Sequence, residues 1–206
     1  MISAKPKIGF YLLIITAVLL TSLIINGCGK KLPDDRAITG GPYKLINQDS
    51  STVNFPGDFK GSKVLMTFIY THCPDICPLT THNMQMIEDK LKSDGVKNVK
   101  FIELSFDPDR DTPSVLRDYG DIRSVNFEKF SFLTGEKSVV DTLLHHMEVI
   151  AIPSDTTYTD DGTPVYYFTH TDRITLIDKD GHIRNEYRGS KAPIDEIVKD
   201  VKILGD

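Results

Sequence analysis

Short apolar runs along this chain alternate with longer amphipathic stretches, and the order of the two types predicts the fold. The runs at residues 63–70 and 99–106 have the character of buried strands, and the stretch 79–93 between them has the spacing of an amphipathic helix. A strand, a helix and a strand in that order predict a parallel pair of strands joined by a right-handed crossover.

The rest of the chain adds strands on both sides of this unit. The expected strands lie at 43–46, 51–54, 130–133, 165–168, 173–177 and 183–187, and the expected further helices at 112–119, 137–149 and 193–204. The first two strands should form a hairpin, and a turn at 178–181 should join the last two. The layout is that of an α/β, thioredoxin-like fold. It has a central mixed sheet flanked by helices, an N-terminal β-hairpin and an inserted strand–helix unit.

Residues 1–28 have a different character. Lys5 and Lys7 precede an apolar run over residues 8–25, which ends in Ile25-Asn26-Gly27-Cys28. A basic start, an apolar middle and a small residue are typical of an export signal, and the last four residues resemble a bacterial lipoprotein signal, in which the cysteine is diacylated. The alternative is an uncleaved anchor helix. Both predict a domain held at the extracytoplasmic side of a membrane in a bacterial cell envelope.

Composition and charge set the remaining bounds. The chain has 206 residues. The segment at residues 29–41 is polar and is expected to be a flexible tether, which leaves residues 42–206 as a single domain. The whole chain has a formal net charge of −5, and residues 1–28 contain two lysines and no acid, so the exported part is more acidic still. This balance argues against nucleic acid as a partner.

The cysteines indicate where the chemistry lies. With Cys28 assigned to lipid, Cys73 and Cys77 remain, in a run of six residues that follows the strand 63–70. Pro78 is expected to open the next helix and Cys77 to be its N-cap, where the helix dipole favours a thiolate, so both thiols should be reactive. A pair separated by three residues cannot link distant parts of a fold. It is therefore a redox pair or a metal site.

A histidine would complete a metal site. Soft thiolates select Cu(I) or zinc, and an added imidazole makes a Cys2His set that can also hold Cu(II). We favour His170, because it follows the strand 165–168 at the sheet edge where the cysteine loop should lie. A loop histidine bonded to backbone is equally compatible with the sequence. His72 is expected to point away from the site, because neighbouring residues on an extended segment point to opposite sides. The other histidines are expected at the surface or rim, His82, His145 and His146, or in a turn, His182.

The segment 105–113 follows the second strand at the same expected edge. Asp111 or Thr112 is expected to cap the helix that begins at Pro113, with Arg110 paired to a nearby acid. The alternative interpretation is that this segment is a scaffold that holds the cysteine loop.

Three motifs in this order give the chain a close resemblance to the Sco/SenC family over about residues 43–204. They are Thr71-His72-Cys73-Pro74-Asp75-Ile76-Cys77-Pro78, Asp107-Pro108-Asp109-Arg110-Asp111-Thr112-Pro113, and Thr169-His170-Thr171 followed by a strand and Asp180-Gly181. Members of that family are membrane-tethered, thioredoxin-like proteins that bind one copper through two cysteines and a distant histidine. They serve assembly of the binuclear copper centre of cytochrome c oxidase, as copper donors, as thiol reductases, or both.

The resemblance implies that Cys73, Cys77 and His170 are the copper ligands and that the copper-bearing subunit of the oxidase, or a similar cuproprotein, is the partner. A metallochaperone is favoured over an enzyme. The alternative is a thiol–disulfide oxidoreductase in which one of Cys73 and Cys77 attacks and the other resolves; a thiol peroxidase ranks third. The chain departs from the family in two ways: Thr169 stands where many members have aspartate, and the segment before His170 is longer.

Overall fold

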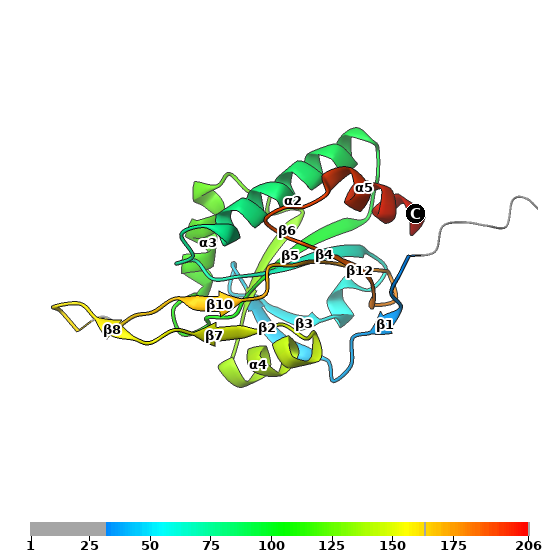
Figure 1. Cartoon of the computed structure of the whole chain (residues 1–206). Coiled ribbons are helices and arrows are strands. Elements are labelled where there is room, and N and C mark those ends of the chain that lie inside the picture. Colours follow the sequence, from blue (N-terminus) through cyan, green and yellow to red (C-terminus); the bar gives the residue numbers. More distant parts are fainter. Residues whose placement is uncertain (1–31, 163, 206) are drawn as a thin grey trace, which may run out of the picture. The chain divides into compact units, whose positions relative to one another are not determined.

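The computed structural model describes residues 32–162 and 164–205, and in these residues the chain forms one eight-stranded mixed sheet (Figure 1). Its strands follow the order β1 (Arg36–Ala37), β12 (His182–Tyr187), β11 (Ile174–Ile177), β4 (Lys63–Ile69), β5 (Val99–Ser105), β6 (Phe130–Thr134), β2 (Tyr43–Asn47) and β3 (Thr52–Phe55). β4, β5 and β6 are parallel, and the other neighbours are antiparallel. The predicted thioredoxin-like α/β fold is confirmed.

Helices cover both faces of the central strands. The described residues contain four α-helices, in chain order α2 (Ile76–Ser93), α3 (Pro113–Ile122), α4 (Lys137–His146) and α5 (Ile194–Ile203). In Figure 1, α2 and α5 lie together on one side of the sheet and α4 lies on the other. Every residue of β4 is buried, as expected for a parallel strand covered on both faces. This rigid layer fixes the ends of β4 and β5 at one edge.

The segment before residue 171 differs from its prediction. The expected strand 165–168 is not part of the main sheet. Instead β7 (Ala151–Pro153) pairs with β10 (Phe168–His170), and β8 (Thr157–Tyr158) pairs with β9 (Pro164–Val165), each pair antiparallel. Figure 1 shows these strands as a narrow arm that extends from the body. The segment between α4 and β11 therefore contains a β-ribbon, because its backbone groups find partners across the arm.

The packed part of the chain also begins earlier than residue 42. The strand β1 pairs with β12, Leu32 is buried, and Arg36 forms ion pairs with Asp34 and Glu186. These contacts order residues 32–37 of the segment that was expected to be a tether. The predicted signal at 1–28, its Cys28 and the start of the tether lie outside the described residues.

Among the described residues, no helix combines the length and the apolar character that a membrane crossing requires.

Candidate metal centre

The cysteine loop lies at the edge of the sheet where the parallel strands β4 and β5 end. The two strand ends are joined by a hydrogen bond from Phe106 N to Ile69 O of 3.0 Å, and the chain then turns through a bond from Cys73 N to Tyr70 O of 3.2 Å. The topology thus delivers the loop after β4 to the edge at which ligands bind in open α/β sheets. This is the position that the sequence predicted.

The start of α2 corrects one detail of the prediction. The helix begins at Ile76 with Asp75 as its N-cap, so Cys77 is the second helical residue and Pro78 the third. Proline is tolerated there because the first helical N–H groups have no partner within the helix in any case. The backbone N–H of Cys77 is one of these groups, and it donates to Cys73 Sγ at 3.4 Å. The helix N-terminus therefore serves Cys73, whereas the sequence predicted that it serves Cys77.

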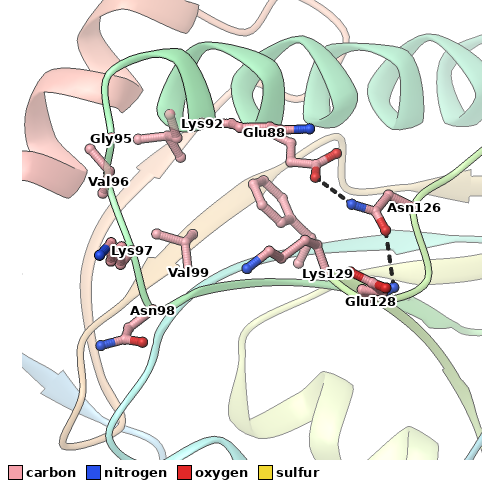
Figure 2. A pocket seen from close by; sticks show the side chains of 12 residues that line it. Glu88, Lys92, Gly95, Val96, Lys97, Asn98, Val99, Asn126, Glu128 and Lys129 are labelled. Carbon is pink, nitrogen blue, oxygen red and sulfur yellow. Dashed lines mark hydrogen bonds between the residues drawn. The ribbon is translucent and has the colours of Figure 1, made fainter.

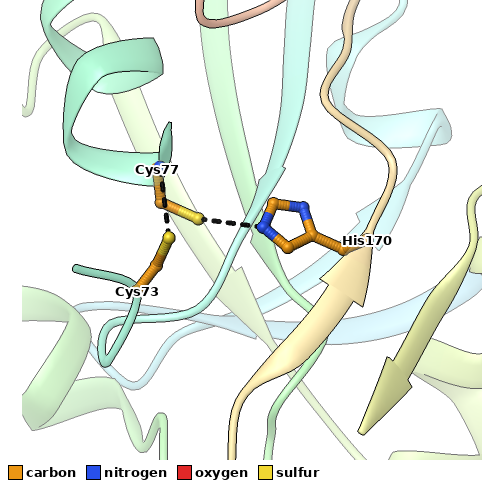
Figure 3. A group of neighbouring side chains, drawn as sticks. All are labelled: Cys73, Cys77 and His170. Atoms are coloured by element: carbon orange, nitrogen blue, oxygen red, sulfur yellow. Dashed lines mark hydrogen bonds between the residues drawn. The ribbon is translucent and has the colours of Figure 1, made fainter. Parts of the chain in front are cut away.

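Cys73, Cys77 and His170 come together in space, as Figure 3 shows. Their possible ligand atoms all lie within 4.8 Å of one another, and Cys77 Sγ is 3.8 Å from His170 Nε2. Both cysteines are buried free thiols, and His170 is half-buried. The histidine comes from the arm, 93 residues after Cys77, so the long-range pairing chosen from the sequence is the one that the fold produces.

The two thiols are not equivalent. The hydrogen bond from the Cys77 thiol lowers the pKa of Cys73, and His170 and the backbone N–H groups of Cys77 and Asp75 act in the same direction against burial. The pKa of Cys77 is raised, because its proton is held in the bond to Cys73 and because burial disfavours its charged form. The surroundings therefore favour the thiolate at Cys73 and keep the proton on Cys77. That both thiols are reactive stays a prediction.

His170 is oriented by its surroundings. Its Nδ1 lies 3.1 Å from the carbonyl oxygen of Thr171, which leaves Nε2 directed at the sulfurs. The rings of Phe106 and Tyr70 pack beside the imidazole, with centroid distances of 5.0 and 5.8 Å. The Thr171 carbonyl thus holds the ring from behind, a role that a carboxylate often fills for a ligand histidine. Burial works against protonation of this ring, but the contact with Cys73 raises the pKa of His170.

Tyr70 also holds the arm in place. Its hydroxyl oxygen accepts a hydrogen bond from Phe168 N at 3.4 Å, and its ring meets the Phe168 ring edge-on at 5.1 Å. Tyr70 follows β4 directly, so one side chain connects the start of the cysteine loop to the strand that carries His170. In the sequence Tyr70 carries no signal of this role, because it ends an apolar run and has the pattern of an ordinary core position.

The segment 105–113 performs both functions that its sequence allowed. Thr112 is the N-cap of α3, and its side chain accepts from Val115 N. Asp111 is fully buried and instead accepts three hydrogen bonds: from Thr71 N at 3.0 Å, from Thr71 Oγ1 at 2.6 Å and from Ser105 Oγ at 2.6 Å. Asp111 therefore fastens the cysteine loop to the end of β5, while Thr112 starts the helix.

Arg110 pairs with Asp107, as expected. Its guanidinium lies 3.6 Å from the centroid of the Tyr166 ring, and the Tyr166 hydroxyl donates to Asp107 at 2.9 Å. This group connects the base of the arm to the same segment.

The other histidines do not join the site. His72 and His82 are exposed, His146 contacts Tyr43, and His182 lies 2.7 Å from Asp35. Within the described residues, Cys73, Cys77 and His170 are the one group of three or more possible ligands that could hold a metal ion.

Two cavities show on which side the cysteine site is open. A cavity of about 480 Å³ lies between the end of α2 and the start of β5, where Glu88 hydrogen-bonds Asn126 and lysine side chains line the rim (Figure 2). This cavity is at the opposite end of β5 from the cysteines and contains neither cysteine nor histidine. A second, more open cavity of about 430 Å³ is lined by Cys73, Ile76, Tyr167 and His170. The site is therefore accessible to a partner from the arm side.

A family model for SCO1/SenC matches residues 32–204. The chain belongs to the SCO1/SenC family. It is 29% identical over 185 residues to the SCO1 protein homolog of Bacillus subtilis, which covers 89% of this chain and 92% of that protein.

Solved structures of Sco proteins have the same fold. ScoI of Bradyrhizobium japonicum, solved with copper bound, is 30% identical and gives a TM-score of 0.65 over 79% of this chain and 97% of its own. BsSco, in which a disulfide switch was identified, is 27% identical and gives a TM-score of 0.68 over 85% of this chain and 98% of its own.

The assignment of Cys73 as the thiolate predicts its pH behaviour. With its pKa lowered from the ordinary 9.0, Cys73 should react with iodoacetamide at nearly the same rate at pH 6 and pH 9, whereas Cys77 should stay unlabelled at pH 6. Peptide mass spectrometry after timed labelling of the reduced chain measures both. In Cys77→Ala, which removes the thiol donor, the Cys73 rate at pH 6 should fall. Faster labelling of Cys77 than of Cys73 would contradict the assignment.

Substitutions at Asp111 and at Thr112 should distinguish anchoring of the cysteine loop from capping of α3. Asp111→Asn removes a charged acceptor of three bonds, so we expect a loss of roughly 1–3 kcal/mol in the free energy of unfolding and altered labelling of Cys73. Thr112→Ala should cost about 1 kcal/mol through the lost cap and leave the labelling unchanged. Urea unfolding and iodoacetamide labelling test the pair, and equal labelling in both variants would refute the anchoring role.

Proposed function

We propose that this protein is a membrane-tethered copper chaperone that binds one copper through Cys73, Cys77 and His170. The observation that carries the proposal is the convergence of two thiols and one imidazole within 4.8 Å, next to an open cavity. Thiolates bind Cu(I) strongly, and an imidazole extends the set to Cu(II). We expect Cu(I) to be held mainly by the two cysteines and Cu(II) to recruit His170.

The residues present fit this cargo. The lowered pKa of Cys73 favours its thiolate. Binding of a cation would displace the proton of Cys77, which is held in the hydrogen bond to Cys73. The Thr171 carbonyl fixes the imidazole so that Nε2 is the free ligand atom. Thr169 stands where many members of the family have an aspartate, but the Thr171 carbonyl supports the imidazole of His170 without that carboxylate.

The relatives support the biological setting. ScoI of B. japonicum was solved with copper bound, and BsSco is described as a member of the Sco family of cytochrome c oxidase assembly proteins. We infer that this chain delivers copper for maturation of the binuclear copper site of cytochrome c oxidase, with the copper-bearing subunit or a similar cuproprotein as its partner. Export and a lipid at Cys28 are part of the proposal, which for residues 1–28 rests on the sequence pattern.

A second function is favoured by one observation, the unequal pair of free thiols. An activated Cys73 beside a protonated Cys77 is the arrangement of an attacking and a resolving cysteine. The protein would then act as a thiol–disulfide oxidoreductase that reduces the cysteines of a copper-receiving partner. The disulfide switch identified in BsSco is consistent with this chemistry.

Copper binding by histidine variants tests the first proposal. We expect the reduced full chain to bind one equivalent of Cu(II) with sulfur-to-copper charge-transfer absorption. His170→Ala should lose this absorption and weaken Cu(II) binding by tenfold or more, on the order of the loss seen when support for a metal ligand is removed, while retaining Cu(I). His72→Ala, adjacent to Cys73 but exposed, should match the wild type.

Two results would contradict these expectations. If the wild type binds no stoichiometric copper and is only oxidised to a Cys73–Cys77 disulfide, the chaperone proposal fails and the oxidoreductase is favoured. If His170→Ala and His72→Ala give identical Cu(II) spectra, the histidine is not a ligand.

A further inference from the structure

Asp172 lies two residues after His170, between the end of β10 and the start of β11, and its side chain is 15% exposed. Its Oδ1 accepts a hydrogen bond from Ser190 N at 2.8 Å, and its Oδ2 accepts one from Ser190 Oγ at 2.5 Å. Its backbone carbonyl accepts from Gly189 N at 3.4 Å, and the exposed Arg188 adds an ion pair at 3.4 Å. Asp172 therefore binds the loop that follows β12 through both its side chain and its backbone.

The same loop is joined to α2. Asn83 Nδ2 donates to the carbonyl oxygen of Gly189 at 2.8 Å, and both Asn83 and Thr80 are buried. A Cβ atom added at Gly189 would be 2.9 Å from Thr80 Oγ1 and 2.7 Å from Oδ1 of Asp172, so only glycine lets the loop approach the helix this closely. These contacts of Asp172 and the loop with α2 form what we call the Asp172 junction.

The Asp172 junction connects the two elements that carry copper ligands. Figure 3 shows Cys77 in the first turn of α2 and His170 at the end of β10. Thr80 follows Cys77 by three residues, about one turn further along the helix. Asp172 follows His170 by two residues, and the carbonyl of the residue between them, Thr171, lies 3.1 Å from His170 Nδ1. A short path of direct contacts thus runs from the imidazole to the helix of the second cysteine.

The other contacts near the histidine do not replace this connection. Tyr70 holds the strand before His170, because its hydroxyl accepts a hydrogen bond from that strand. The hydrogen bonds between Thr171 and Ile150 join the two sides of the arm, so they would move with it. The Asp172 junction fixes the chain after His170 against α2. Without it the imidazole would be held toward the cysteines from one side alone.

We propose that Asp172 is a positioning residue that sets the distance between His170 and the cysteine pair. The proposal rests on the proposed copper site and says how its third ligand is held there. Thiolates select Cu(I), whereas an imidazole is the ligand that extends the set to Cu(II). The two cysteines lie on one short segment and do not need the junction to come together. Asp172 therefore controls Cu(II) binding and leaves Cu(I) binding unchanged.

Competition titration with chelators measures both copper states on the reduced full chain. Asp172→Ala should weaken Cu(II) binding by about tenfold or more, on the order of the loss seen when support for a metal ligand is removed. Its sulfur-to-copper absorption should change as well, while its Cu(I) affinity should equal that of the wild type. Asp155→Ala, which removes an exposed carboxylate from the same arm, is the control and should match the wild type in both states.

Asp172→Asn separates position from charge. Asparagine keeps an acceptor oxygen for Ser190 N and gains an amide that can donate to Ser190 Oγ, so this variant should bind Cu(II) nearly as tightly as the wild type. A carboxylate that acted only by attracting the cation would behave differently. Equal losses of Cu(II) affinity in Asp172→Asn and Asp172→Ala would overturn the positioning role.

Gly189→Ala disturbs the junction from its other side. The added Cβ should push Asp172 away from Thr80, so Cu(II) affinity should fall as in Asp172→Ala. Gly57→Ala is the matched control, because a Cβ there meets nothing within 4 Å. This pair decides the matter if Asp172→Ala does not fold. Wild-type Cu(II) affinity in Gly189→Ala would overturn the proposal.

Metal-free crystals of Asp172→Ala and of the wild type test the geometry without copper. The distance between Cys77 Sγ and His170 Nε2, which is 3.8 Å in the intact junction, should be longer in the variant. An unchanged distance would overturn the proposal. Absence of stoichiometric copper in the wild type would instead overturn the proposed function, and the crystal distance would still decide whether Asp172 positions the histidine.

Discussion

The site depends on the buried carboxylate of Asp111. The loop that carries the two cysteines leaves the sheet at the end of β4, where strand pairing no longer holds its backbone. Asp111 holds the loop there by accepting hydrogen bonds from Thr71 N, Thr71 Oγ1 and Ser105 Oγ. Hydrogen bonds to a charged acceptor are stronger than neutral ones, and one residue here satisfies donors from two strand ends. The position of Cys73 relative to α2 follows from this anchor.

Because Asp111 fixes the position of the cysteine loop, the two thiols lie in different surroundings. The loop brings Cys73 Sγ to the backbone N–H of Cys77, so the positive end of the helix acts on the first cysteine and the second becomes a donor to it. His170 reaches the same point from the arm, held by aromatic rings and by the Thr171 carbonyl. A metal cargo and a disulfide both require two sulfurs within bonding reach, so a single geometry supports copper binding and thiol exchange alike.

The sequence predicted the features that local pattern controls. The strands at 63–70 and 99–106 agree with β4 and β5 to within a residue, because buried parallel strands are continuous apolar runs. The convergence of the two cysteines and His170 was also foreseen, with the help of the family motifs. The start of α2, the arm and the anchoring by Asp111 were not resolved in advance. A proline at the third helical position, cross-strand pairing within a polar segment and a bond over 40 residues are fixed by tertiary contacts that leave no periodic signal.

Cys73, Cys77 and His170 are proposed to form one copper site. X-ray absorption at the copper edge, recorded on the copper-loaded full chain in the Cu(II) state and after reduction to Cu(I), tests it most directly. We expect a first coordination sphere with two sulfur atoms and an imidazole nitrogen in the Cu(II) state, and retention of both sulfurs in the Cu(I) state. A sphere of nitrogen and oxygen atoms alone, or one sulfur atom per copper, would contradict it.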